Sequence, residues 1–175
     1  MNVQGQRLPA VSAVEQRIAA WSTTAAAPIV IHRYRPTGDQ YSVPGGLVHH
    51  IEPIPEALAR ELREELDLDL GQIADPPQLR WVQDQISHRP GTTTPLRRLH
   101  LVHLVTLPPG IRHTIATTEQ DAEDQSEVTW IDCDEAASLH LYPDIGPALG
   151  GFPDTANSTG PVWLRPMNDI TYRWR

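Results

Sequence analysis

The amino-acid sequence predicts a single α/β domain, because segments of strand and helix character are mixed along one chain of 175 residues. A chain of this length can bury one sizeable hydrophobic core and is short for two domains. No internal repeat is visible along it. We therefore expect one domain over residues 1–175, with its core at about 27–150 and a C-terminal extension at about 151–175.

The first expected element is a short N-terminal helix at about residues 12–21. Apolar residues recur at helical spacing in Val14, Ile18 and Trp21, and Ser12 begins a capping box in front of them. This helix would precede the core of the domain.

Strands are expected where β-branched and aromatic residues gather between turn-forming residues. These runs lie at 29–34, 41–43, 78–86, 96–107 and 127–131. Helical periodicity extends over 54–66, and shorter helical segments follow at 134–139 and 144–149. The tail is rich in Gly, Pro, Asn, Ser and Thr up to Gly160 and then turns aromatic, which predicts a linker followed by an ordered extension.

Composition and charge argue against several classes of function. The formal net charge of -8 argues against sequence-independent binding of nucleic acid, which needs clustered Lys and Arg. Cys133 is the one cysteine, so no intramolecular disulfide can form, and its thiol is expected to serve packing. Residues 1–9 lack signal-peptide character, and no run approaches the roughly 20 apolar residues that span a bilayer. We expect a cytoplasmic protein without membrane contact.

The segment 54–66 has two functional faces when its residues advance by about 100° each. One face is apolar and is expected to pack on the core: Leu58, Leu62 and Leu66. Beside it, three carboxylates project as neighbours at helical spacing: Glu61, Glu64 and Glu65. We call these three residues the glutamate trio.

The glutamate trio is a candidate metal site. Like charges at this spacing destabilise a helix by about a few tenths of a kcal/mol per pair, so a compensating cation is expected. Hard cations such as Mg²⁺ or Mn²⁺ prefer carboxylate oxygen and commonly bridge to substrate phosphates. The alternative is a solvated acidic face, with Arg60 and Arg63 as partners within the helix.

The wider spacing around the trio resembles the Nudix box, the motif of a family of hydrolases. The matching positions are Gly46, Glu52 and the run 60–68, Arg-Glu-Leu-Arg-Glu-Glu-Leu-Asp-Leu. The one departure is Asp67, where the family usually has Gly to leave the helix with positive φ. Asp tolerates this conformation better than most residues, so we expect an effect on the turn and not on the metal site.

The resemblance implies an α/β/α sandwich built on a mixed β-sheet, over most of residues 29–149. It implies that the glutamate trio and the backbone carbonyl of Gly45 hold the metal, Mg²⁺ with Mn²⁺ as a substitute. It also implies that Gly46 supports the site and that Glu52 braces the loop by pairing with Arg60. The general base would be one of the trio or a glutamate elsewhere. Family members often carry a further catalytic glutamate before a late strand, where Glu127 is the best match and Glu123 the second.

Outside the box, three residues are candidates for substrate binding. Arg97 and Arg98 could bind substrate phosphates by charge-assisted hydrogen bonds, and Tyr41 could stack on a nucleobase. A basic surface patch and ordinary core packing are the alternatives. Three roles stay open for the last aromatic segment, namely docking on the domain, a homodimer contact, or an edge of the substrate pocket; its residues are Tyr172, Trp174 and Arg175.

Taken with the resemblance, these features predict a Mg²⁺-dependent hydrolase. It would cut a diphosphate linkage in a nucleoside diphosphate linked to another group, of the nucleoside triphosphate, nucleotide sugar or ADP-ribose type. One alternative is a non-hydrolytic nucleotide sensor or scaffold, and a lesser one is an isoprenyl diphosphate isomerase or a prenyl diphosphate hydrolase. The expected partner is a small phosphorylated substrate, and a homodimer is left open.

Overall fold

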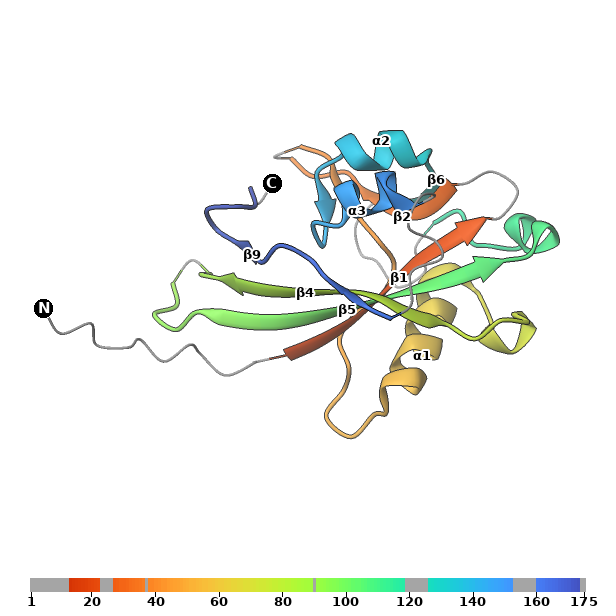
Figure 1. Cartoon of the computed structure of the whole chain (residues 1–175), viewed down its shortest axis with the longest axis horizontal. Helices are drawn as coiled ribbons and strands as arrows, with labels where there is room; N and C mark the ends of the chain where they lie inside the picture. Colours follow the sequence, from red (N-terminus) through yellow and green to blue (C-terminus); the bar gives the residue numbers. More distant parts are fainter. Residues whose placement is uncertain are drawn as a thin grey trace, which may run out of the picture.

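The computed structural model describes residues 13–22, 27–36, 38–89, 91–118, 126–152 and 160–173. A mixed β-sheet runs through the molecule, with α1 on one face and α2 and α3 on the other (Figure 1). The α/β/α sandwich expected from the sequence is therefore confirmed. The described strands are β1 (Ala13–Ser22), β2 (Ala27–Arg33), β3 (Gln40–Ser42), β4 (Gln78–Ser87), β5 (Leu96–Leu107), β6 (Ser126–Trp130), β7 (Leu141–Tyr142), β8 (Val162–Trp163) and β9 (Met167–Asn168). The α-helices are α1 (Ile54–Leu66), α2 (Cys133–Ser138) and α3 (Gly146–Gly150), and the 3₁₀ helices are η1 (Leu70–Gln72) and η2 (Pro109–His113).

The sheet has two halves, β7-β3-β2-β6 and β1-β5-β4 with β8 and β9, which meet where β1 pairs with β2. In the described residues its order is β7-β3-β2-β1-β5-β4-β8, with β6 paired to β2 and β9 paired to β4. β1 runs parallel to β5 along its whole length but pairs with β2 at only two positions, Trp21 with Pro28 and Ser22 with Ala27. The two halves therefore diverge away from this junction.

The N-terminal helix expected at about 12–21 is wrong, because residues 13–22 form β1. Positions 14 and 18 share a side in a strand as well as in a helix, so their spacing does not separate the two. The parallel pairing of β1 with β5 from Ala13–Arg98 to Ser22–Leu107 satisfies its backbone, and such pairing is invisible in local sequence.

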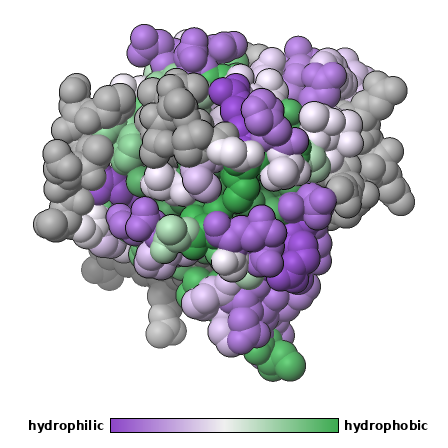
Figure 2. Space-filling view, turned by 90° about the vertical axis from the view of Figure 1, so that its right-hand side faces the viewer, coloured by the Kyte–Doolittle hydropathy of each residue, from purple (hydrophilic) through white to green (hydrophobic). Residues whose placement is uncertain are grey.

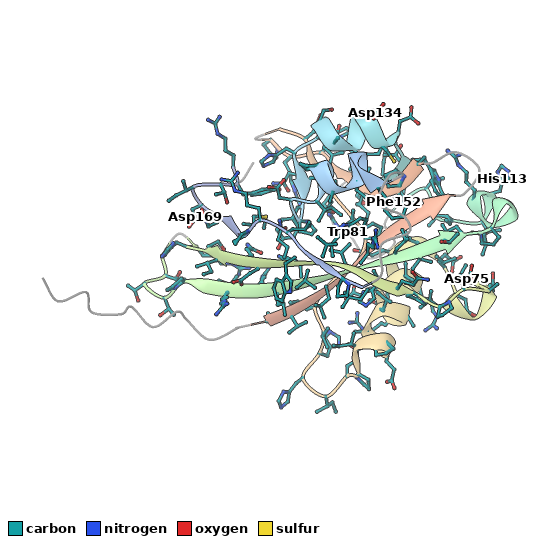
Figure 3. The ribbon with its side chains drawn as sticks, in the orientation of Figure 1. Asp75, Trp81, His113, Asp134, Phe152 and Asp169 are labelled. Atoms are coloured by element: carbon teal, nitrogen blue, oxygen red, sulfur yellow. The ribbon has the colours of Figure 1, made fainter. Side chains whose placement is uncertain are left out.

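Two hydrophobic clusters, one on each face of the sheet, hold the layers together. β2 contributes to both, because its alternate residues point to opposite faces. Ile29 packs with the apolar stripe of α1, and Val30 packs with α2 and α3. Figure 3 shows Trp81 and Phe152 in the second cluster, where their rings meet edge to face at 5.8 Å and 70°.

The C-terminal segment 160–173 is ordered and extends the sheet beside β4. β8 and β9 pair in parallel with β4, and the buried side chain of Gln83 on β4 donates to the carbonyl of Arg165 at 3.1 Å. Near the hairpin between β4 and β5, the Asp169 carboxylate accepts from the backbone amide of His88 at 2.9 Å (Figure 3). The linker expected before this extension falls largely on residues 153–159, which lie outside the described residues.

The surface is mixed in character. On the face in Figure 2, hydrophilic residues surround a small apolar area, and an apolar tip stands at the bottom of the view. The loop before α1 is the lowest part of Figure 1, and Ile51 in it is 91% exposed. None of the helices in the described part of the chain has the length and apolar character needed to cross a bilayer.

Cys133 is expected to resist alkylation in the folded protein. It is buried at the start of α2, and burial, followed by the carboxylates of Asp134 and Asp132, raises the pKa of its thiol to about 11. At pH 8 about one thiol in a thousand is then the reactive thiolate. Labelling with iodoacetamide at pH 8 should be slow in buffer and at least about 100-fold faster in urea, where the thiol pKa returns to about 8.5. Equal rates in both conditions would contradict this burial.

Candidate active site

The candidate site is built on a glycine turn between β3 and α1. Gly45 has a φ of 121°, a conformation that L side chains rarely adopt. Its backbone N–H donates to Oε2 of Glu65 at 2.5 Å. The turn is thereby attached to the last turn of α1, twenty residues further along the chain.

The helix α1 has the bounds predicted from its periodicity, Ile54–Leu66. Leu62 and Leu66 are fully buried and Leu58 is 3% exposed, so the apolar stripe packs as expected. The trio lies on the edge of this stripe in three different environments. The exposed fractions of its side chains are 7% for Glu65, 12% for Glu61 and 44% for Glu64.

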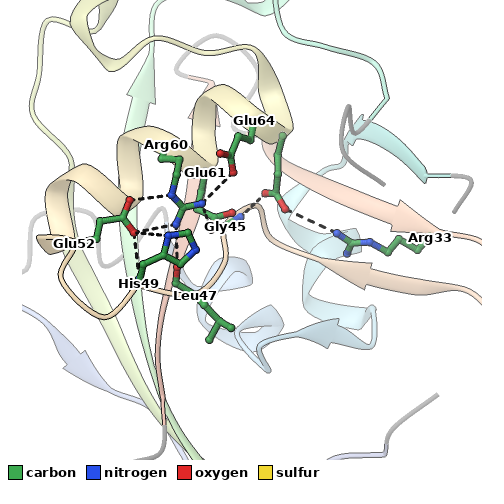
Figure 4. Close-up of polar contacts among 9 residues, drawn as sticks. Arg33, Gly45, Leu47, His49, Glu52, Arg60, Glu61 and Glu64 are labelled. Carbon is green, nitrogen blue, oxygen red and sulfur yellow. Dashed lines mark hydrogen bonds and ion pairs between the residues drawn. The ribbon is translucent and has the colours of Figure 1, made fainter. Parts of the chain in front are cut away.

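Arg60 connects the trio to the preceding loop (Figure 4). Its Nη1 donates to Oε1 of Glu61 at 2.7 Å and to Oε2 of Glu64 at 3.0 Å. Its Nε and Nη2 donate to the two oxygens of Glu52 at 2.8 and 3.0 Å, and Nη2 also donates to the carbonyl of Leu47. The Glu52–Arg60 ion pair that the resemblance implies is thus present. The carboxylates of Glu61 and Glu64 both accept a hydrogen bond from Nη1 of Arg60.

Glu52 is ionised at every working pH. The hydrogen bond from Arg60 lowers the pKa of its carboxyl from 4.5 to about 2, partly offset by burial and assisted by the His49 amide. Since the folded-state pKa is the lower one, this ion pair contributes stability above about pH 4.5 and loses it as the pH falls towards 2. The loop therefore stays attached to α1 through the neutral range.

Asp67 ends α1 in the left-handed conformation, with φ 52° and ψ 34°. Its N–H donates to the carbonyl of Arg63, and the N–H of Leu68 donates to the carbonyl of Leu62. The first of these bonds, over four residues, is that of the αL cap usually built around a glycine. The departure from the family pattern at this position therefore leaves the turn geometry intact.

The substitution Gly46→Ala is expected to reduce kcat/KM by about 10- to 100-fold, the scale of losing an interaction that orients a metal ligand. A Cβ at position 46 would overlap the Glu61 carboxylate, which would have to leave Arg60. Gly110→Ala is the matched control, because a Cβ there meets no atom within 4 Å. Steady-state hydrolysis by both variants measures the effect, and unchanged activity in Gly46→Ala would show that the position of Glu61 is irrelevant.

A cavity of about 230 Å³ is lined by residues from both halves of the sheet, and none of the trio is among its lining residues. Arg33 links the cavity to the trio, because it lines the cavity while its Nη2 lies 3.9 Å from Oε1 of Glu65. Arg33 was not among the predicted site residues. The alternation of side chains along β2 could have indicated its position. Arg33 lies on the same face of the strand as Ile29, which packs against α1.

The predicted substrate residues separate into two groups. Tyr41 and Arg98 line the cavity. Arg97 does not, because adjacent residues of a strand point to opposite faces and its guanidinium binds the Asp84 carboxylate at 2.9 and 3.0 Å. Of the two arginines, only Arg98 lines this cavity.

The structure does not bring Glu127 to the trio. It pairs across the strands with His32, and its carboxylate accepts from the Tyr34 hydroxyl at 3.0 Å. His32 shares the face of Val30, which packs with α2 and α3, whereas the trio lies on α1. The prediction that Glu127 is catalytic receives no support from this placement. Glu123, Trp174 and Arg175 lie outside the described residues.

The trio fits a hard divalent cation by its chemistry. Its donors are carboxylate oxygens, which Mg²⁺ and Mn²⁺ prefer, and Glu61 and Glu64 already share one positive group. Within the described residues, however, no three His, Cys, Asp or Glu side chains have donors gathered as a finished metal site. The carboxylates are directed instead to Arg60, Gly45 and Arg33, so a metal ion held by the trio would require their side chains to rotate.

Comparison with known proteins gives one family and one fold. The family described as "NUDIX domain" matches residues 22–149. A comparison with curated proteins finds no match. Similar solved structures include a mutator MutT protein from Bacillus halodurans, with 15% identity, coverage of 86% of both chains and a TM-score of 0.59. An Ap4A hydrolase from C. elegans has 14% identity, covers 82% of this chain and 97% of its own, and has a TM-score of 0.57. The dihydroneopterin triphosphate pyrophosphohydrolase of E. coli has 21% identity, covers 74% and 88%, and has a TM-score of 0.54.

The chain belongs to the NUDIX family, because the family match covers most of its length and contains the whole glycine turn and α1. It is a hydrolase that acts on phosphorus-containing anhydrides. Nudix hydrolases in general use divalent metal ions, which agrees with the oxygen donors of the trio.

Proposed function

We propose that this protein is a Mg²⁺-dependent hydrolase of a diphosphate linkage in a nucleoside diphosphate joined to another group. The observation that carries the proposal is the anchoring of Glu65, which is buried on α1 and held to the Gly45 turn. A buried carboxylate is stable only where positive or hydrogen-bonding groups face it, as the Gly45 N–H and the Arg33 guanidinium do here, and a bound cation would add to this compensation. The cation would be held by the trio and the Gly45 carbonyl.

When bound, Mg²⁺ neutralises the diphosphate and lowers the pKa of an attacking water. The chain's own residues do the rest. Glu64 is the most exposed of the trio, and its carboxylate is therefore placed to accept a proton from water at the surface of the site. Arg33 lies between Glu65 and the cavity, where its guanidinium binds and orients a phosphate by charge-assisted hydrogen bonds.

The two alternative functions are less well supported. A non-hydrolytic sensor has no need of carboxylates crowded on one helical turn, and this chain keeps all three. An isoprenyl diphosphate isomerase of this fold depends on a cysteine placed before the box. The only cysteine here is Cys133, which is buried at the start of α2.

A substrate panel tests the proposal. Purified protein with Mg²⁺ is given nucleoside triphosphates, nucleotide sugars, ADP-ribose, dinucleoside polyphosphates and prenyl diphosphates, and the products are identified. We expect cleavage of at least one nucleotide, with phosphate or diphosphate release abolished in Glu64→Gln. Cleavage of prenyl diphosphates alone would contradict the nucleotide part of the proposal, and no cleavage at all would contradict the whole.

A further inference from the structure

The cavity lined by Arg33 is built partly by the C-terminal segment 160–173. Tyr172 lines it, although the NUDIX match ends at residue 149. The other lining groups that carry the argument come from the core of the domain: Arg33, Tyr41, Arg98, His140 and Tyr142. Tyr172 therefore lies outside the part of the chain that the family model matches.

A tight turn brings Tyr172 into place. The N–H of Tyr172 donates to the carbonyl of Asn168 at 2.8 Å, and the Asn168 side-chain oxygen accepts from the amides of Ile170 and Thr171 at 2.9 and 3.0 Å. Asn168 itself belongs to β9, which pairs with β4. After the turn, Nε2 of His140 donates to the carbonyl of Arg173. Hydrogen bonds therefore hold the backbone in place both before and after Tyr172.

Ring contacts within the protein hold the aromatic wall of the cavity in place. The ring of Tyr172 stacks on His140, with centroids 4.3 Å apart and an interplanar angle of 24°. It also meets Tyr142 edge to face at 6.3 Å and 65°. Tyr172 is 6% exposed, so its ring is a packed wall whose conformational entropy is already lost.

A hydrogen-bond chain fixes the polar side of the cavity. Nη1 of Arg98 donates to the Tyr142 hydroxyl at 3.2 Å, and this hydroxyl donates to Oε1 of Gln85 at 3.1 Å. Gln85 is 2% exposed, and the same oxygen lies 2.7 Å from Nε2 of His100, which is fully buried. These hydrogen bonds hold the guanidinium of Arg98, on β5, where this residue lines the cavity.

We propose that this cavity binds the nucleoside part of the substrate and that Tyr172 determines specificity by contacting the base. The inference rests on the proposed function, since Arg33 would direct the attached phosphate towards Glu65. A planar base suits packed rings edged by guanidinium and hydroxyl groups, whereas a prenyl chain would need an apolar lining. The cavity volume of about 230 Å³ lies below the usual range for whole small-molecule ligands, which favours a ligand part no larger than one nucleoside.

Binding of reaction-independent probes tests the inference on the full chain. Dissociation constants are measured by calorimetry, in EDTA, for the adenosine, guanosine, cytidine and uridine monophosphates and for ribose 5-phosphate, which lacks a base. We expect at least one nucleotide to bind about 10-fold more tightly than ribose 5-phosphate, the scale of one stacked base. Tyr172→Leu should remove this preference, because leucine keeps apolar volume but has no ring.

Two further variants separate contact with the base from general damage. Tyr172→Phe should retain the preference within about 3-fold because the ring remains. Ile170→Ala, in the same turn and 94% exposed, should bind like the wild-type protein. The proposal is overturned if no nucleotide binds at millimolar concentration, if ribose 5-phosphate binds equally well, or if Tyr172→Leu keeps the preference. Since no hydrolysis is measured, these outcomes do not depend on the substrate panel, and failure of the panel with retained binding would remove the proposed function alone.

Discussion

Replacing Glu65 by glutamine is expected to lower kcat/KM by at least about 100-fold while the fold is retained. The loss corresponds to removing one preorganised electrostatic group from the site. The folded state should survive because the amide oxygen of glutamine can still accept the hydrogen bond from the Gly45 N–H. Relief of repulsion among three neighbouring carboxylates acts in the same direction, so the melting temperature should be unchanged or higher.

The control for this substitution is Glu56→Gln, which removes an exposed carboxylate from the first turn of the same helix. Initial rates with a substrate found in the panel and thermal melts of both variants give the comparison. Glu56→Gln should match the wild-type protein in rate. Full activity in Glu65→Gln would remove Glu65 from the catalytic site.

The substitution Leu62→Ala is expected to have the opposite profile, a large loss of stability with the chemistry preserved. Leu62 is fully buried between α1 and the sheet, and a cavity left by Leu→Ala costs about 3 kcal/mol. For a domain of this size the melting temperature should fall by about 10 °C. Below that temperature the neighbouring Glu61 remains on the same helix, so kcat should change by less than about 5-fold.

Urea unfolding of Leu62→Ala measures the change in the free energy of unfolding. Ile51→Ala is the matched control, because Ile51 is 91% exposed and its truncation should cost under about 0.5 kcal/mol. A similar small loss in Leu62→Ala would contradict the packing of α1 against the sheet.

Long segments with a strong pattern could be predicted closely from the sequence. The bounds of α1 and of β5 match their predictions at both ends, 54–66 and 96–107. In α1 the apolar and acidic positions recur with helical spacing over nearly four turns. One rotation of the helix about its axis therefore buries the apolar positions and leaves the acidic ones at the edge of the core. The glutamate trio follows from the same periodicity, because placing the leucines on the core fixes the direction of the glutamates.

Features that depend on pairing between distant segments could not be predicted. β1 was expected as a helix because its positions 14 and 18 fit both periods, and the pairing with β5 decides between them. The different directions of Arg97 and Arg98 follow from the pleat of β5 and from Asp84 on β4. The position of Tyr172 follows from the pairing of β9 with β4. In each case the deciding partner lies in another strand.

The measurement that tests the glutamate trio most directly is a Mg²⁺ titration of hydrolysis. Protein freed of metal with EDTA is supplied with increasing Mg²⁺ at a fixed concentration of a cleaved nucleotide, for the wild-type chain and for Glu64→Gln. We expect no activity without metal, saturable recovery in the wild-type protein, and little recovery in Glu64→Gln. Equal rates with EDTA and with Mg²⁺ would contradict a metal-dependent site on α1.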